Sequence, residues 1–236
     1  MKKPWLLGIL LIAVIFVACC LWILWPRFVS NNSGQANLAV PKSIENLPLS
    51  KLRRIGNVTV ARLQSPAIID GFPCAASWVH FGESARLKAF YLGETCTIQG
   101  YEIPKGTWVQ LNSDLTLRFC AFPEDTNIQG YVCDGGKGGS EGLTTGFYPS
   151  GRLSSFFPPK DVEIQGIPCK GSLYSPIYFF ENGNLKEFTL SKDAVIGGRA
   201  LSGGRRVIFN EQGQVQSVSS HSIFERAGSW LINVFR

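Results

Sequence analysis

The sequence predicts an all-β protein in which about five antiparallel β-hairpin repeats of roughly 30 residues form one extended or curved sheet. A transmembrane helix is expected before the repeats and an amphipathic helix after them. Two observations carry this prediction: a tripeptide recurs along the body with apolar pairs behind it, and an uncharged apolar run opens the chain. Since 45% of the 236 residues are hydrophobic, the body has ample apolar surface to bury.

Residues 1–27 are expected to form a membrane anchor. Between Pro4 and Pro26 lies an uncharged apolar run of 21 residues, close to the roughly 20 that a helix needs to cross a bilayer. Lys2 and Lys3 precede the run, which favours a cytoplasmic N-terminus and an extracytoplasmic body. The prediction is a single-pass membrane protein.

Two alternatives for this segment stay open: cleavage after Ala36 and lipid attachment at Cys19. Apolar residues continue from Cys20 to Trp25, which places Ala36 far beyond the apolar run and gives a lipidated Cys19 a hydrophobic tether. An uncleaved anchor therefore fits the length of the run better.

Residues 28–54 are expected to be a linker, because they are polar, rich in Asn and Ser, interrupted by Pro and without a regular apolar period. The basic end of this segment holds Lys51, Arg53 and Arg54. Contact of that end with lipid head groups is the alternative to simple solvation.

Residues 55–221 are expected to form the repeat domain. A tripeptide Ile-x-Gly recurs there at spacings of 29, 30, 36 and 32 residues, starting at Ile69, Ile98, Ile128, Ile164 and Ile196. A strand-like pair of residues two positions apart, apolar except for Thr145, follows each tripeptide, and an apolar anchor comes six positions after the second member of the pair. These pairs and anchors are Val79/Phe81 with Leu87, Val109/Leu111 with Leu117, Thr145/Phe147 with Leu153, Ile177/Phe179 with Leu185, and Val207/Phe209 with Val215.

Tight turns are expected to separate the strands of each unit. Gly151, Gly183 and Gly213 lie where a hairpin needs a positive φ angle. A second turn, in which a carboxylate accepts hydrogen bonds from its own local backbone, is predicted at Asp125, Asp161 and Asp193. Each unit would thus hold about three short strands.

Neighbouring units are expected to share one antiparallel sheet, because a unit of this length cannot bury a two-sided core alone. An apolar spacing of three, from Leu185 to Phe188, predicts a β-bulge in that sheet. The same spacing recurs from Leu87 to Phe90 and from Leu153 to Phe156.

The stretches Ile177–Phe188 and Gly146–Phe156 combine aromatic residues, a turn glycine and a following Leu. They resemble the second class of MORN repeats, bacterial β-hairpin repeats of the type YYxNGxLK. The resemblance covers about half of each unit, and these units add a second hairpin that carries the Ile-x-Gly tripeptide. It implies an interaction surface, antitoxin-like in some members, rather than an enzyme.

The body holds five cysteines: Cys74, Cys96, Cys120, Cys133 and Cys169. Three of them share a slot that holds Ile103 and Leu201 in other units, which favours packing in the core. One or two disulfides are the alternative, and Cys133 with Cys169 is the pair to test. Because no CxxC pair or His cluster is present, no metal site is predicted.

No enzyme, catalytic residue, cofactor or nucleic-acid partner is predicted. The chain has only two His, and the flanking apolar pair points His80 away from the core. The formal charge is +6 overall but zero beyond residue 54, where 16 basic and 16 acidic residues cancel. A neutral body argues against binding to a phosphate backbone.

The candidate partner-binding residues are Gln99, Gln129 and Gln165, Lys137 and Trp230. The three Gln are the middle residues of Ile-x-Gly tripeptides, and Lys137 lies in a glycine-rich insertion, Asp134–Gly142. Loops on a rigid scaffold often carry binding function. The alternative for a Gln in a repeated turn is to satisfy neighbouring backbone groups.

Residues 222–236 are expected to form an amphipathic helix, because Phe224, Ala227 and Leu231 belong to an apolar stripe at helical spacing. A cap on the last repeat and a helix in the membrane interface are the two alternatives for its role. The chain is thus expected to be a membrane-anchored binding or scaffolding module with an envelope protein or polysaccharide partner. An antitoxin-like or immunity role and, less favoured, an envelope enzyme are the alternatives.

Overall fold

The computed structural model describes residues 45–82, 85–136 and 143–220, which belong to one compact unit, Pro41–Arg236. Within these ranges the regular secondary structure is β-strand throughout, as predicted. No helix of the described ranges is long and apolar enough to span a bilayer. Four predictions fall outside the described residues: the anchor at 1–27, the helix at 222–236, Lys137 and Trp230.

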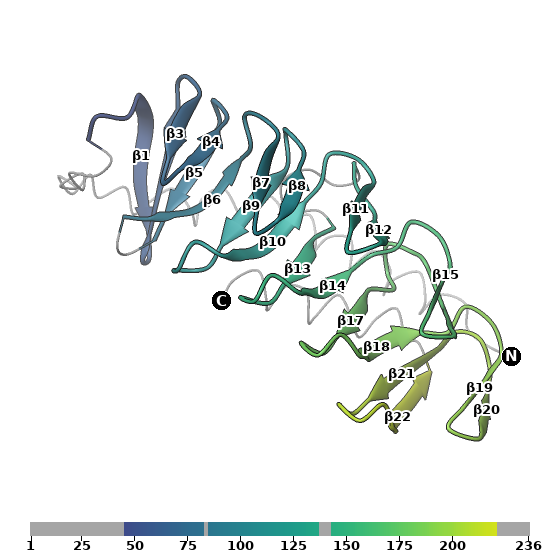
Figure 1. The fold of residues 1–236 in the computed structure, drawn as a ribbon. Coiled ribbons are helices and arrows are strands. Elements are labelled where there is room, and N and C mark those ends of the chain that lie inside the picture. Colours follow the sequence, from purple (N-terminus) through teal and green to yellow (C-terminus); the bar gives the residue numbers. More distant parts are fainter. Residues whose placement is uncertain (1–44, 83–84, 137–142, 221–236) are drawn as a thin grey trace, which may run out of the picture. The chain divides into compact units, whose positions relative to one another are not determined.

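Twelve strands form one antiparallel sheet in which spatial order follows chain order (Figure 1). These strands are β1 (Leu49–Ile55), β2 (Val58–Leu63), β5 (Trp78–Phe81), β6 (Leu87–Tyr91), β9 (Trp108–Leu111), β10 (Leu117–Ala121), β13 (Thr145–Phe147), β14 (Leu153–Phe156), β17 (Ile177–Phe179), β18 (Leu185–Thr189), β21 (Arg205–Phe209) and β22 (Val215–Ser220). The predicted common sheet is therefore confirmed.

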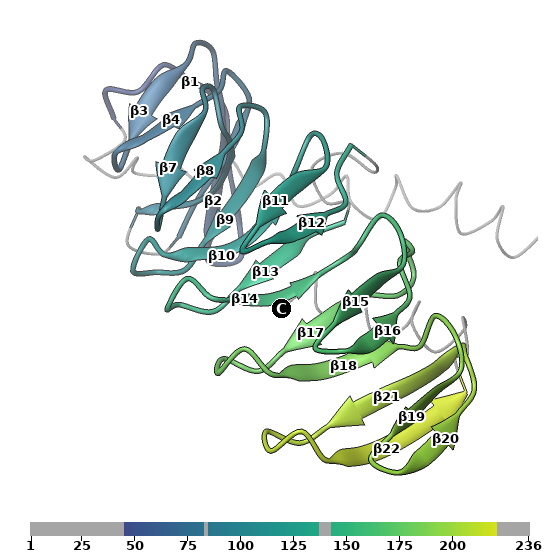
Figure 2. The ribbon, with the colours of Figure 1, turned by 45° about the vertical axis from the view of Figure 1, so that its right-hand side comes forward.

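The other strands pair into five two-stranded hairpins, called the small hairpins below. They are β3 (Ala67–Ile69) with β4 (Phe72–Cys74), β7 (Cys96–Ile98) with β8 (Tyr101–Ile103), β11 (Thr126–Ile128) with β12 (Tyr131–Cys133), β15 (Val162–Ile164) with β16 (Ile167–Cys169), and β19 (Ala194–Ile196) with β20 (Arg199–Leu201). The small hairpins lie along one face of the large sheet, the inner face (Figure 2).

Each repeat consists of one small hairpin followed by two strands of the sheet, so a unit holds four strands and not the three predicted. The sequence pattern missed one strand because each strand of a small hairpin is only three residues long. Over three residues an alternation of apolar and polar side chains is too short to mark a strand.

The sheet begins earlier than the predicted repeat domain, since β1 occupies the end of the predicted linker. Leu49 and Leu52 pack against the core from this strand, while its basic side chains stay exposed. Lys51 has a positive φ angle of 52°, and the register of β1 against β2 shifts around it. Charge and a bulge are features that protect an edge strand from unwanted pairing.

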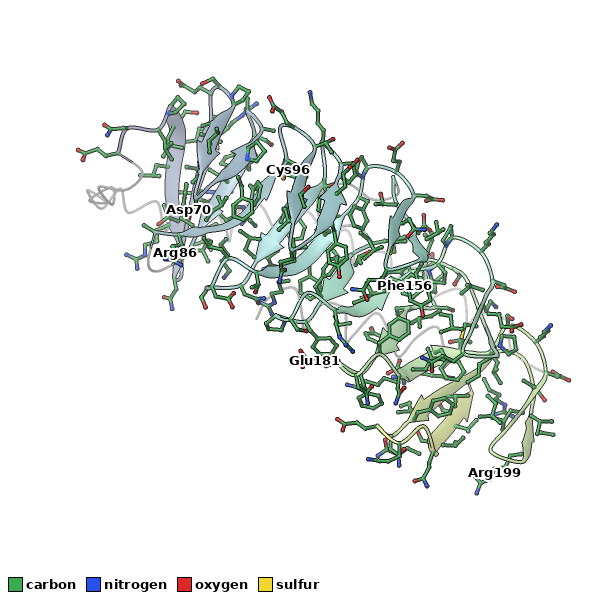
Figure 3. The ribbon with its side chains drawn as sticks, viewed as in Figure 1. Asp70, Arg86, Cys96, Phe156, Glu181 and Arg199 are labelled. Atoms are coloured by element: carbon green, nitrogen blue, oxygen red, sulfur yellow. The ribbon has the colours of Figure 1, made fainter. Side chains whose placement is uncertain are left out.

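The core lies between the inner face of the sheet and the small hairpins. Phe81, Phe90, Phe156 and Phe188 are among its largest fully buried side chains. Figure 3 shows Phe156 in this layer. The large sheet and the row of small hairpins thus form two layers that each bury one face in a shared core. A single unit is too small to form such a core alone.

The predicted bulge is confirmed in the sheet. Tyr178 faces Glu187 and Phe179 faces Leu185, so Lys186 is an extra residue on β18. The same register shift occurs in every repeat, between β5 and β6, β9 and β10, β13 and β14, and β21 and β22. It recurs because the apolar residue before the extra one is buried in the core in four units and packs against the core, as Val215, in the fifth.

Candidate functional site

The recurring tripeptide forms the turn of each small hairpin. In the second unit Ile98 pairs with Tyr101, and the two residues between them, Gln99 and Gly100, have φ angles of 49° and 85°. Positive φ at both positions defines a type I′ turn, which suits the twist of a two-residue hairpin. The middle position is Asp70, Gln99, Gln129, Gln165 or Gly197 in successive units, and all five have positive φ.

The side chains at this middle position reach the sheet strands that follow in the chain. Oε1 of Gln99 accepts a hydrogen bond from the backbone N–H of Leu117 at 2.7 Å. Oε1 of Gln165 accepts one from Leu185 at 3.3 Å, and Oδ2 of Asp70 accepts one from Leu87 at 2.7 Å. Figure 3 shows Asp70 near Arg86, the residue before Leu87. These Leu residues begin the bulged strands, so the turn side chain supports the backbone at the bulge.

The amide nitrogens of the three Gln donate to carbonyl groups in the turns between sheet strands. Gln99 donates to Pro149 O at 3.0 Å, which links the second unit to the third. Gln129 donates to Gly151 O at 3.1 Å, and Gln165 donates to Gly183 O at 2.9 Å. The structure thus provides contacts for the backbone-satisfying alternative, while partner binding by the Gln side chains stays a prediction.

We expect Gln99→Ala to destabilise the fold by about 2 kcal/mol, because two side-chain hydrogen bonds are lost and one backbone N–H is left without its acceptor. Gln99→Gly should cost about 1 kcal/mol less, since glycine adopts positive φ without the penalty that other residues incur. Denaturant titration followed by circular dichroism measures both. An Ala variant as stable as the wild type would contradict this role.

A second repeated contact closes the other end of each small hairpin. Oδ1 of Asp161 accepts a hydrogen bond from the N–H of Gly171 at 2.9 Å. Asp125 with Gly135 and Asp193 with Gly203 repeat the contact at 3.1 and 2.8 Å. In the second unit, Thr95 Oγ1 accepts from Lys105 N at 3.1 Å.

The predicted local turn at these Asp residues is therefore corrected, since in each case the acceptor and donor are ten residues apart. The carboxylate bridges the two ends of the hairpin because antiparallel pairing brings them together.

The connection from the small hairpin to the sheet differs in length between units. From the last residue of the small hairpin to the first inner residue of the sheet strand, the third unit spans 12 positions and the fourth spans 8, against 5 or 6 in the others. These two long connections, residues 134–144 and 170–176, are called the loop pair below. Residues 137–142 of the loop pair lie outside the described residues.

The loop pair lies at one end of the sheet. The connections enter β13 and β17, which are both antiparallel to the strand between them, β14. The starts of β13 and β17 therefore lie at the same end, about 10 Å apart at the usual strand spacing. Within the described residues, the ends of the two connections that enter β13 and β17 thus lie side by side.

The loop of the fourth unit holds two exposed apolar side chains, Leu173 at 40% and Tyr174 at 63% exposure. Ser172 organises it, because Oγ of Ser172 accepts from the N–H of Tyr174 at 3.1 Å and contacts Oγ of Ser175 at 3.2 Å. Ser175 is itself buried. Leu173 and Tyr174 therefore stand on a turn that hydrogen bonds of Ser172 hold within the loop.

The prediction that cysteines pack in the core is confirmed for Cys74, Cys120, Cys133 and Cys169, all with 0% exposure. All five described cysteines are free thiols, so the alternative pairing of Cys133 with Cys169 does not occur in the structure. Burial raises the pKa of the Cys133 and Cys169 thiols to about 12. Burial, with the Asp70 carboxylate adding to it, does the same for Cys74.

We expect these buried thiols to be unreactive in the native chain at pH 8, because the thiolate is the nucleophile and burial disfavours it. Half-buried Cys96 should be the first of the five to react with a maleimide, measured by mass spectrometry in a Cys19→Ser/Cys20→Ser background. Equal labelling of all five before denaturation would contradict the core.

The same thiols predict a pH dependence of stability. In the unfolded chain these thiols have their ordinary pKa of 9.0, whereas burial raises the pKa of Cys74, Cys133 and Cys169 to about 12 in the folded chain. The folded state then binds more protons than the unfolded state, so unfolding becomes easier as pH rises from 9 to 12. The contribution of these thiols to the free energy of unfolding is complete below pH 9 and is lost progressively between pH 9 and pH 12.

The described residues hold no group of three or more His, Cys, Asp or Glu that could bind a metal ion. No family model, curated protein or solved structure matches this chain. The resemblance to MORN repeats stays a prediction, and the candidate surface has to be judged from its own geometry.

Proposed function

We propose that this chain is a membrane-anchored β-repeat protein of the cell envelope that acts as a binding or scaffolding module. Its N-terminus would be cytoplasmic and its repeat body extracytoplasmic, held by the apolar run before Pro26. The loop pair would contact the partner, with Leu173 and Tyr174 at the centre of the contact.

The observation that carries this proposal is the exposed pair Leu173 and Tyr174. The pair stands on a hydrogen-bonded turn in the longest of the connections that are described in full. Solvent-exposed apolar side chains cost solubility, and tyrosine is enriched where proteins bind one another. A preordered turn also loses little conformational entropy on binding. An aliphatic side chain beside an aromatic one is better suited to contact a protein than to contact a polysaccharide.

Site-specific photo-crosslinking of the full-length chain in intact cells tests the proposal. A photoreactive phenylalanine analogue replaces Tyr174 in one variant and Val195 in the other. Val195 is the matched control, because it is 73% exposed but lies on a small hairpin of the last unit. We expect a discrete adduct from position 174 and none from position 195.

Two outcomes would count against the proposal. Equal adducts at both positions, or none at either, would remove the loop pair as the contact surface. An external protease that leaves the repeat body intact in cells without an outer barrier would contradict its extracytoplasmic location. Digestion of the adduct by a protease or by glycosidases distinguishes a protein partner from a polysaccharide.

A further inference from the structure

The outer face of the sheet, which is the face opposite the small hairpins, changes character along the array. The strands β1, β2, β5, β6, β9 and β10 contain six basic residues and no Asp or Glu. One of the six, Arg54, lies on the inner side, because it pairs with Thr59, which pairs with Phe81. The six strands that follow in the sheet contain three basic residues and one Glu, with serines on β14 and β22. The first six strands of the sheet thus hold more basic residues than the last six, and they hold no acidic residue.

Aromatic rings share this half of the outer face. Val79 and Phe81 of β5 are fully buried, so Trp78 on the same strand points outward. The register places Tyr91 opposite Trp108 on the same face, and Phe119 follows opposite Gln110. All four aromatic residues are half-buried. We call this surface, formed by Trp78, Tyr91, Trp108, Phe119, Arg53, Arg62 and Arg118, the aromatic face.

Arginines lie against two of these rings. The guanidinium of Arg53 lies 5.3 Å from the ring centroid of Trp78, and that of Arg118 lies 5.5 Å from that of Phe119. Arg62 pairs directly opposite Trp78 across the strands. The three arginines are exposed, so their charges face solvent beside the rings.

We propose that the aromatic face docks on anionic lipid head groups in the extracytoplasmic leaflet of the membrane in which the chain is anchored. This inference rests on the proposed function, because it requires that the chain has a membrane anchor. Tryptophan and tyrosine prefer the boundary between head groups and acyl chains, because their rings are apolar with a polar tip. Clustered arginines are attracted to anionic head groups over a Debye length.

The position of the face in the chain supports this occupant. Only the 23 residues from Pro26 to Pro48 separate the apolar run from β1, the first strand of the aromatic face. A random coil of 23 residues has a mean span of about 26 Å. The six strands of the aromatic face span about 24 Å. The half of the sheet that bears rings and cations is therefore the half that is joined to the apolar run by the shorter stretch of chain.

Tryptophan quenching in proteoliposomes tests the docking. The full chain is reconstituted in phosphatidylcholine alone or mixed with phosphatidylglycerol, with bromines near the carbonyl end of the acyl chains. One variant retains only Trp22 among the six tryptophans and reports on the anchor, and a second retains only Trp78 and Trp108 and reports on the aromatic face. The remaining tryptophans are replaced by phenylalanine.

We expect strong quenching of Trp22 in both lipids, and quenching of Trp78 and Trp108 that rises several-fold with the anionic lipid and falls with added salt. Arg53→Gln/Arg62→Gln/Arg118→Gln should abolish most of the quenching at Trp78 and Trp108. Lys105→Gln/Lys170→Gln/Arg199→Gln is the matched control, since it removes three exposed charges next to or within the small hairpins and should leave the quenching unchanged. Circular dichroism verifies that both triple variants are folded.

If Trp78 and Trp108 stay unquenched in the second variant while Trp22 is quenched in the first, the docking is overturned and the anchor stands. The aromatic face would then be open to a polysaccharide or a protein. Unquenched Trp22 would overturn the anchor and the docking together. Equal loss of quenching in both triple variants would also overturn the docking, because the effect would then follow net charge and not this face.

Discussion

Leu185→Asp is expected to unfold the fourth unit and its neighbours. Leu185 is 1% exposed, starts β18 and belongs to the core between the sheet and the small hairpins. A carboxylate there would be buried without a partner, and its cost, with the lost apolar packing, is about 4 kcal/mol or more. Stability in a repeat array depends on contacts between neighbours, so the damage should spread along the sheet. Thermal melting followed by circular dichroism measures the loss.

Lys186→Asp is the matched control for this substitution. Lys186 is the extra residue of the bulge and is exposed, with its ammonium 5.3 Å from the Phe180 ring centroid. The control introduces the same carboxylate one position away and should cost about 1 kcal/mol at most. If the two variants melted alike, the assignment of Leu185 to the inner face would be wrong.

The sequence allowed prediction of the features that rest on side-chain polarity at a fixed period. The five units, their inward pairs such as Ile177 and Phe179, and the bulge after Leu185 all follow from the rule that alternate residues of a strand share a face. The cysteine slots could be assigned because Ile103 fills the same place in another unit. Internal repetition supplied the comparison that one unit alone lacks.

Other features depend on contacts between residues that are distant in the sequence, and these could not be predicted. The partner of Asp161 is ten residues away and that of the Gln99 amide nitrogen is fifty, so local turn chemistry suggested the wrong acceptors and donors. A three-residue strand such as β15 carries too few side chains to show a period. One signal was available: an x-Gly pair directly after Ile and before another apolar residue indicates a two-residue type I′ turn.

The surfaces proposed for binding also could not be predicted from the sequence. Neither Leu173 nor Tyr174 stands out in the sequence, because an exposed apolar pair is indistinguishable from a core pair until the strands around it are placed. The aromatic face also emerges only from the register, which brings Tyr91 and Trp108 opposite each other from different units. Sequence reasoning favoured the Gln side chains instead, whose amide nitrogens donate within the fold.

Gly171→Ala is expected to cost about 3 kcal/mol, the upper part of the usual range for overpacking. A Cβ at position 171 would overlap the carbonyl group of Lys160, because the hydrogen bond to Asp161 draws the two backbone segments together. The clash involves backbone on both sides, so no side chain can move to relieve it. Denaturant titration measures the loss, and the variant should also disorder the turn that presents Leu173.

Alanine substitutions at two further glycines are expected to cost less than Gly171→Ala. At Gly203, in the same position of the fifth unit, a Cβ would lie 3.0 Å from Cα of Lys192, a tight contact that small shifts relieve, so Gly203→Ala should cost about 2 kcal/mol. At Gly166 a Cβ meets nothing within 4 Å, but φ is +77°, so Gly166→Ala should cost about 1 kcal/mol through backbone strain alone. The order Gly171, Gly203, Gly166 separates steric overlap from strain. A cost at Gly171 no larger than that at Gly166 would mean that the approach of Lys160 does not explain the glycine at position 171.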